Sequence, residues 1–124
     1  MKTITINGKD YSCVLKTKTC VQLEKKLGTN PLNELVKMSA DINENIVPDM
    51  EKVLLFFHYC LIDMNHGITL DNVYDIFDEY RTECKDVMVS PVINLLNFVV
   101  EVFVDSGFIS EPDEPKKETK GKNK

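Results

Sequence analysis

Apolar residues recur along the chain with two different periods. Polar and apolar residues alternate in Thr3–Ile6, as in a β-strand with one buried face, and Tyr11–Leu15 resumes a strand-like pattern. Asn7-Gly8 stands between them and is the preferred dipeptide of a two-residue type I′ turn. We therefore predict a β-hairpin over residues 2–16. One of its faces must pack on other elements, because two strands alone are marginally stable in water.

The apolar residues that follow have helical spacing, and cap and turn residues divide them into five segments. Thr19 with Gln22 three positions on predicts a capping box for the first helix, and Gly28 predicts its left-handed end. Asn30-Pro31 and Ser90-Pro91 each place a cap residue before a proline at the first helical position. The expected helices cover residues of about 19–27, 31–39, 48–66, 70–83 and 90–106.

The boundaries of the two middle helices follow from similar signals. Pro48 suits the first turn of the central helix, Asp49 favours the positive end of that helix, and Gly67 is expected to close it. Thr69 is the predicted cap of the fourth helix. Residues 41–46 have no clean period and are expected to form a variable loop.

Two segments, Val53–Ile62 and Val92–Val104, are apolar around most of a helix circumference. A body of this size encloses about one such helix comfortably, by surface-to-volume scaling. We therefore expect the central helix to be hidden and the last helix to meet partners. The candidate interface residues are Ile93, Phe98, Val100, Phe103, Val104 and Phe108.

Length and composition indicate one α+β, mostly α-helical domain over residues 1–110, in which the hairpin packs on a bundle of about five helices. The chain has 124 residues, of which 43% are hydrophobic and 28% charged. Residues 111–124 contain two prolines, five lysines and four acids but no apolar residue, so we expect a disordered tail. The net charge of −5 argues against a nucleic-acid partner.

Membrane insertion and secretion are not expected either. No apolar run reaches the roughly 18 residues that a membrane span requires. Met1–Ile6 begins as a strand rather than as a signal peptide, so the four cysteines are expected to be reduced thiols of a cytoplasmic protein. Cys13, Cys20 and Cys60 are expected to be small buried hydrophobic residues, and Cys84 to be exposed.

The residues with reactive or metal-binding side chains do not form a recognisable catalytic, cofactor or metal site. His58, Asp63 and His66 are five and three positions apart, which is not the spacing of a helical metal pair. We expect His58 to lie at the core edge with a hydrogen-bond partner and His66 at the helix end. Cys60 cannot pair with His58, because residues two apart on a helix point about 200° away from each other.

Four crowded acids of the fourth helix, Asp71, Asp75, Asp78 and Glu79, also lack ligand spacing. A calcium loop places oxygens on alternate residues, whereas these follow helical spacing, so a solvated or partner-facing surface is favoured. No enzymatic activity is expected.

Four motifs follow one another along the chain: Ile4–Lys9, Leu23–Gly28 with Asn30–Leu32, Ile68–Tyr80, and Ser106–Phe108. In this order they resemble the tail assembly chaperones of long-tailed bacteriophages and prophages of Gram-positive bacteria. The match spans nearly the whole body, and the order and spacing carry it rather than any single motif. The chain departs from the pattern after the fourth helix, where it has Glu83–Asp86 in place of glycine or small polar residues.

The resemblance implies a non-enzymatic protein without a cofactor, which binds the tape measure protein, keeps its long helices soluble and helps recruit tail tube protein. It also implies a location in the host cytoplasm and absence from the mature virion. Surplus apolar helix surface is compatible with binding a helical client in a groove. The alternative is a small oligomeric scaffold or regulatory adaptor, in which the same surface forms a homo-oligomer.

Overall fold

The computed structural model describes residues 1–84 and 90–110, so the predicted tail at 111–124 lies outside the described residues. A two-stranded antiparallel hairpin comes first and five helices follow, which confirms the α+β, mostly helical fold. The elements are β1 (Lys2–Ile6), β2 (Lys9–Cys13), α1 (Thr17–Leu27), α2 (Pro31–Asn43), α3 (Met50–Ile62), α4 (Leu70–Glu83) and α5 (Pro91–Asp105).

The hairpin has the predicted type I′ turn, with φ angles of 54° at Asn7 and 77° at Gly8. Ile6 pairs with Lys9 and Lys2 with Cys13, so Ile6 and Cys13 lie on one face, where both are fully buried. The backbone N–H of Val14 donates to the carbonyl of Cys60 over 3.1 Å. The hairpin is thereby joined to α3 directly after its second strand.

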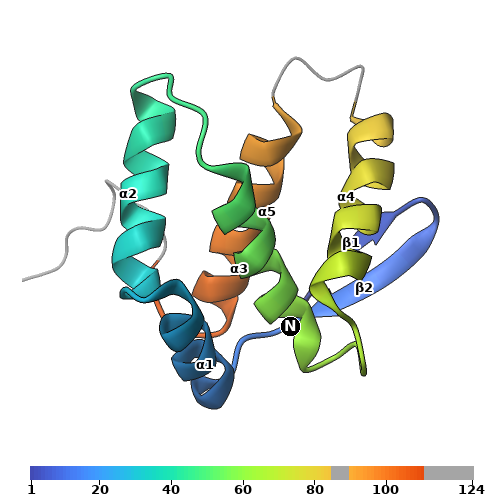
Figure 1. Cartoon of the computed structure of the whole chain (residues 1–124), viewed down its shortest axis with the longest axis horizontal. Helices are drawn as coiled ribbons and strands as arrows, with labels where there is room; N and C mark the ends of the chain where they lie inside the picture. Colours follow the sequence, from blue (N-terminus) through green and yellow to red (C-terminus); the bar gives the residue numbers. More distant parts are fainter. Residues whose placement is uncertain (85–89, 111–124) are drawn as a thin grey trace, which may run out of the picture.

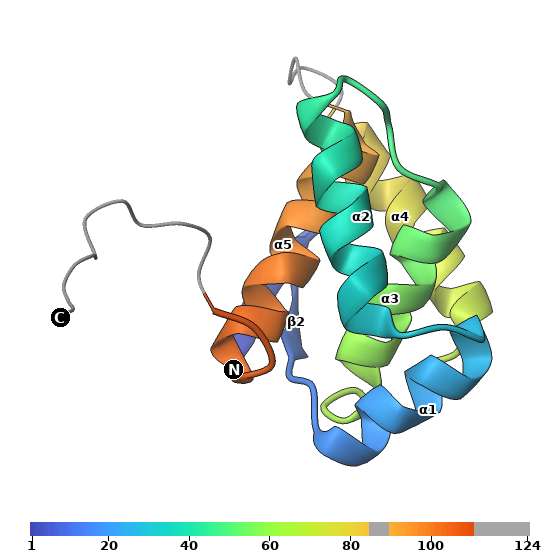
Figure 2. The same ribbon diagram turned by 90° about the vertical axis from the view of Figure 1, so that its left-hand side faces the viewer.

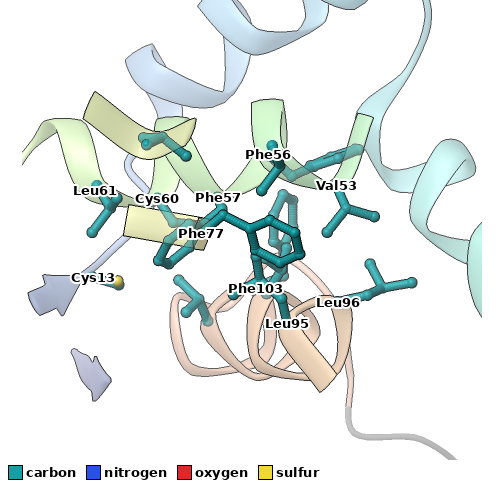
Figure 3. Packing of buried hydrophobic residues seen from close by; sticks show 14 of the residues in the cluster. Cys13, Val53, Phe56, Phe57, Cys60, Leu61, Phe77, Leu95, Leu96 and Phe103 are labelled. Atoms are coloured by element: carbon teal, nitrogen blue, oxygen red, sulfur yellow. The ribbon is translucent and has the colours of Figure 1, made fainter. Parts of the chain in front are cut away.

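The core is built around a crossing of α3 and α5, with α2 and α4 on either side (Figure 1). The ring of Phe56 on α3 packs edge-on against the ring of Phe103 on α5, with 5.8 Å between the ring centroids. Phe57 and Phe98 make a second such pair at 6.4 Å. Figure 3 shows Phe56, Phe57 and Phe103 between the two helices, with Phe77 of α4 beside them.

Helix α3 is enclosed, and α5 is enclosed except along one side. No residue from Lys52 to Ile62 is exposed, and in α5 only Asn97, Glu101 and Asp105 are exposed. The apolar faces of α3 and α5 pack against each other, so each helix covers the other. An estimate that treats each helix separately leaves out this mutual burial.

The start of α1 differs from the prediction. The helix begins at Thr17, its N-cap residue Lys16 makes no side-chain cap hydrogen bond, and Thr19 lies inside the first turn. Instead of capping, the buried Thr19 hydroxyl donates to Asp63 Oδ2 over 2.7 Å. The predicted capping box is therefore wrong, because a partner distant in sequence takes the hydroxyl.

The lengths of α2 and α3 also differ from the predictions. Helix α2 continues past residue 39 to Asn43, since Ile42 extends the apolar stripe of Leu35 and Met38 onto the core. Helix α3 begins after Asp49, which caps it by accepting from the N–H of Glu51 over 3.2 Å. It ends at Ile62 and not near Gly67.

An asparagine holds the turn that follows α3. The Asn65 side-chain amide donates to the carbonyls of Ser12 and Leu61, each over 2.9 Å. The first of these bonds ties the turn to β2, which anchors the end of the central helix to the hairpin.

Candidate functional site

The structure places the six predicted interface residues in two groups. Phe103 is fully buried between Phe56 and Phe108, so its predicted role as a direct partner contact is wrong for the folded chain. The others are partly buried: Phe98, Val100 and Phe108 pack against the core, and Ile93 and Val104 are likewise only partly covered. The structure does not bring the six into one surface.

Val100 and Val104 do share a groove, which lies between α5 and α2 and has a volume of about 660 Å³. Figure 2 shows the two helices running alongside each other. Ile42 of α2 supplies the facing apolar wall, and Glu101 and Asp105 lie beside the two valines. We call this space the α2–α5 groove. Its volume lies in the range typical of binding sites. Its walls carry both apolar and polar residues, as in grooves that accept part of a helix.

An ion pair secures the outer wall of this groove. Glu34 of α2 is 9% exposed, and its carboxylate accepts from the Lys52 ammonium of α3 over 2.9 Å. The hydrogen bond to Glu34 raises the pKa of Lys52 above its usual value. The ion pair holds α2 against α3. It could not be predicted from the sequence pattern, because Glu34 and Lys52 are on different helices.

A second groove, of about 670 Å³, lies between the start of α3 and the outer side of α4. Its exposed walls are Met50 and Tyr74, and its floor is Leu54 and Phe77. We call it the α3–α4 groove. Sequence reasoning missed it, although one signal was present: Tyr74 is an aromatic residue on the acidic face of its helix.

A third hollow, between the hairpin and α4, is mostly polar and has a volume of about 480 Å³. Tyr11 lies in it, with the Lys9 ammonium 5.3 Å from the ring centroid. Burial, followed by the nearby charge of Glu79, raises the pKa of Tyr11. No serine, threonine or cysteine is among the described residues that line this hollow.

The histidines occupy structural positions. His58 Nε2 lies 3.1 Å from the carbonyl of Ile68 and donates to it, which is the predicted arrangement at the core edge, and His66 is exposed in the turn after α3. Asp63 is engaged by Thr19. Across residues 1–84 and 90–110, no group of three or more His, Cys, Asp or Glu side chains is arranged to hold a metal ion.

The cysteines are free thiols in the described chain. Burial raises the pKa of Cys13 to about 12 and that of Cys60 well above its usual range. Burial, with the charge of Glu24, also raises the pKa of Cys20. Cys84 is half-buried rather than exposed, which corrects the prediction, and burial together with Cys84 raises the pKa of Tyr80. Raised thiol pKa values are the opposite of what a nucleophilic cysteine needs.

The acidic residues of α4 are all exposed, and Asp78 accepts from the Arg81 guanidinium over 2.6 Å. None of the described helices is both long and apolar enough to cross a membrane.

Comparison with known proteins identifies no relative: no family model, no curated protein and no solved structure matches the chain.

Proposed function

We propose that the chain is a tail assembly chaperone of a long-tailed bacteriophage or prophage, which binds the tape measure protein and helps recruit tail tube subunits. The support from the sequence is the ordered set of motifs from Ile4–Lys9 to Ser106–Phe108. The structural observation that supports it best is the α2–α5 groove, because Val100 and Val104, two of the predicted interface residues, line it. The protein acts in the host cytoplasm and is absent from the finished virion.

The groove fits a helical client. Its apolar walls, Ile42 on one side and Val100 and Val104 on the other, are suited to residues three or four apart on one face of a helix. The polar groups beside them, including Asn43 and Glu101, can form a rim that excludes water from the apolar contact. Covering apolar stripes of a long helical protein in this way would keep the client from aggregating before the tube assembles around it.

The test is co-expression with the tape measure protein encoded beside this chain. The unmodified protein is expected to raise the soluble yield of the client and to co-purify with it, and Val100→Asp with Val104→Asp is expected to abolish both effects. Val36→Asp is the matched control, because Val36 is 66% exposed on α2 and does not line the groove. Unchanged yield and no co-purification with the unmodified protein would refute the proposal.

The scaffold alternative uses the same apolar groove between copies of this chain. Sedimentation equilibrium of the purified protein separates the two functions. A stable oligomer that Val100→Asp with Val104→Asp dissociates, without any effect of the protein on client solubility, would favour the scaffold.

A further inference from the structure

The α3–α4 groove has two large, exposed apolar side chains on its walls. Met50 is 49% exposed and Tyr74 is 41% exposed, while Leu54 and Phe77 beneath them are each 4% exposed. Methionine adapts its shape to different partners, and tyrosine is enriched among the residues that dominate binding energy at interfaces. The groove thus combines a buried apolar floor with one adaptable wall, Met50, and one aromatic wall, Tyr74.

Two of the strongly exposed apolar residues share this groove. Of the eight large apolar residues that are strongly exposed in the described chain, Met50 and Tyr74 line the groove, and Ile46 and Val47 lie in the loop four and three positions before Met50. Isolated apolar residues on a surface are ordinary, whereas Met50 and Tyr74 come together at one hollow.

The segment that contains both helices of the groove is acidic. Residues 49–83 carry eight carboxylates and only two cations, Lys52 and Arg81. Each cation already has a carboxylate partner, Glu34 for Lys52 and Asp78 for Arg81. Glu51, Asp78 and Arg81 line the groove itself, and because Arg81 is paired with Asp78, the lining remains acidic through Glu51. An occupant therefore gains from positive charge beside its apolar stripe.

A second copy of this chain fits poorly as that occupant. Its lysine-rich helix is α1, where Val21 is the one strongly exposed large apolar residue, and on α2 only Val36 is comparably exposed. A single valine cannot fill a hollow of about 670 Å³ that faces Met50 and Tyr74. The described surface thus lacks a basic helix with an apolar stripe.

We propose that the α3–α4 groove docks a partner's amphipathic helix whose apolar stripe is flanked by lysine and arginine. This site is separate from the α2–α5 groove and does not rest on the chaperone function. The apolar stripe of the partner covers Leu54 and Phe77 between Met50 and Tyr74, and its basic flanks lie against Glu51 and the acids of α4.

The experiment uses the full chain and three labelled peptides of about 18 residues, which as helices are about 27 Å long. The first has leucines at helical spacing flanked by lysines, the second has the same leucines flanked by glutamates, and the third is a scrambled form of the first. Binding is followed by fluorescence anisotropy. The variant is Met50→Ala with Tyr74→Ala, which changes no charge. The matched control is Val21→Ala with Val36→Ala, which also changes no charge, because both valines are strongly exposed and line none of the three hollows.

The lysine peptide is expected to bind at least about tenfold more tightly than either of the other peptides, and the Met50→Ala, Tyr74→Ala variant to bind it at least about tenfold more weakly. The control variant is expected to bind it as the unmodified protein does. Circular dichroism verifies that both variants keep their helix content, and Met50→Gln with Tyr74→Gln replaces the alanine variant if it does not.

Three results would overturn the inference: equal binding of the scrambled peptide, equal binding of the glutamate peptide, or no effect of the groove variant. Self-association of the protein without peptide, dissociated by Met50→Ala with Tyr74→Ala, would also overturn it, because a second copy would then be the occupant. A failed tape measure assay with intact peptide binding would refute only the proposed function, and the reverse would refute only this inference.

Discussion

Phe103→Ala tests the α3–α5 crossing on which both grooves depend. The Phe103 side chain is fully buried, and its ring centroid lies 5.8 Å from that of Phe56 and 6.3 Å from that of Phe108. Truncation removes the ring from the centre of the core and leaves both neighbours facing a cavity. The sequence alone places the same residue on a partner surface, so the two descriptions predict different effects.

The expected loss is large compared with total stability. Replacing a buried phenylalanine by alanine costs about 3–5 kcal/mol, from lost burial and from the cavity left behind. Small domains unfold with a total of about 5–15 kcal/mol. For a body of about 100 residues, each kcal/mol shifts the melting temperature by about 4–8 °C, so a fall of at least about 12 °C is expected.

Urea unfolding followed by circular dichroism at equal protein concentrations measures the difference. Val104→Ala is the control on the next residue of the same helix: Val104 is partly exposed beside the α2–α5 groove, so its truncation is expected to cost less than about 1 kcal/mol. If Phe103→Ala also cost less than about 1 kcal/mol, or weakened only the binding of a partner, the packing of α5 against α3 would be wrong.

Further predictions concern thiols, a helix cap and the hairpin turn. At pH 8 in the native state, Cys13 and Cys60 are expected to react with a chromogenic disulfide reagent far more slowly than the half-buried Cys20 and Cys84, because burial raises the pKa values of Cys13 and Cys60. All four thiols should react fast in urea. Fast reaction of all four thiols in the native protein would contradict this. Asn30→Ala is expected to lower the free energy of unfolding by about 1 kcal/mol, since the Asn30 carboxamide accepts from the N–H of Leu32 over 2.8 Å at the start of α2; an unchanged urea midpoint would count against the cap. Gly8→Ala is expected to cost about 1–2 kcal/mol through backbone strain alone, because φ is +77° and a Cβ there meets nothing within 4 Å; thermal melting checks it, and a stabilised protein would disagree.

Features set by neighbouring residues could be predicted from the sequence. The Asn7-Gly8 turn, the Asn30 cap and the Thr69 cap each depend on a few adjacent positions, and each is present as predicted. The structure adds that Asn72 completes a capping box with Thr69. Thr19 shows where this reasoning stops. Like Thr69, it is followed three positions later by an amide residue, but its hydroxyl donates to Asp63, which is 44 positions away.

The grooves could not be predicted for the same reason. The sequence correctly identifies Val92–Val104 as too apolar for an ordinary surface helix, but the side that stays accessible depends on the angle at which α5 crosses α3. That crossing buries Phe103 and leaves Val100 and Val104 beside α2. Met50 and Tyr74 are twenty-four positions apart, and only the packing of α4 against α3 brings them to one hollow.

The two grooves share their support but not their outer walls. Helix α5 forms the inner wall of one and α3 the inner wall of the other, and these two helices are joined through Phe56 and Phe103. The outer walls are α2 and α4, which lie on opposite sides of that pair (Figure 1). A change at the α3–α5 crossing should therefore weaken binding in both grooves together, whereas a change on an outer wall should affect one groove only. This arrangement requires that Phe103→Ala weaken both tape measure binding and peptide binding. It also requires that Val100→Asp with Val104→Asp weaken only tape measure binding, and that Met50→Ala with Tyr74→Ala weaken only peptide binding.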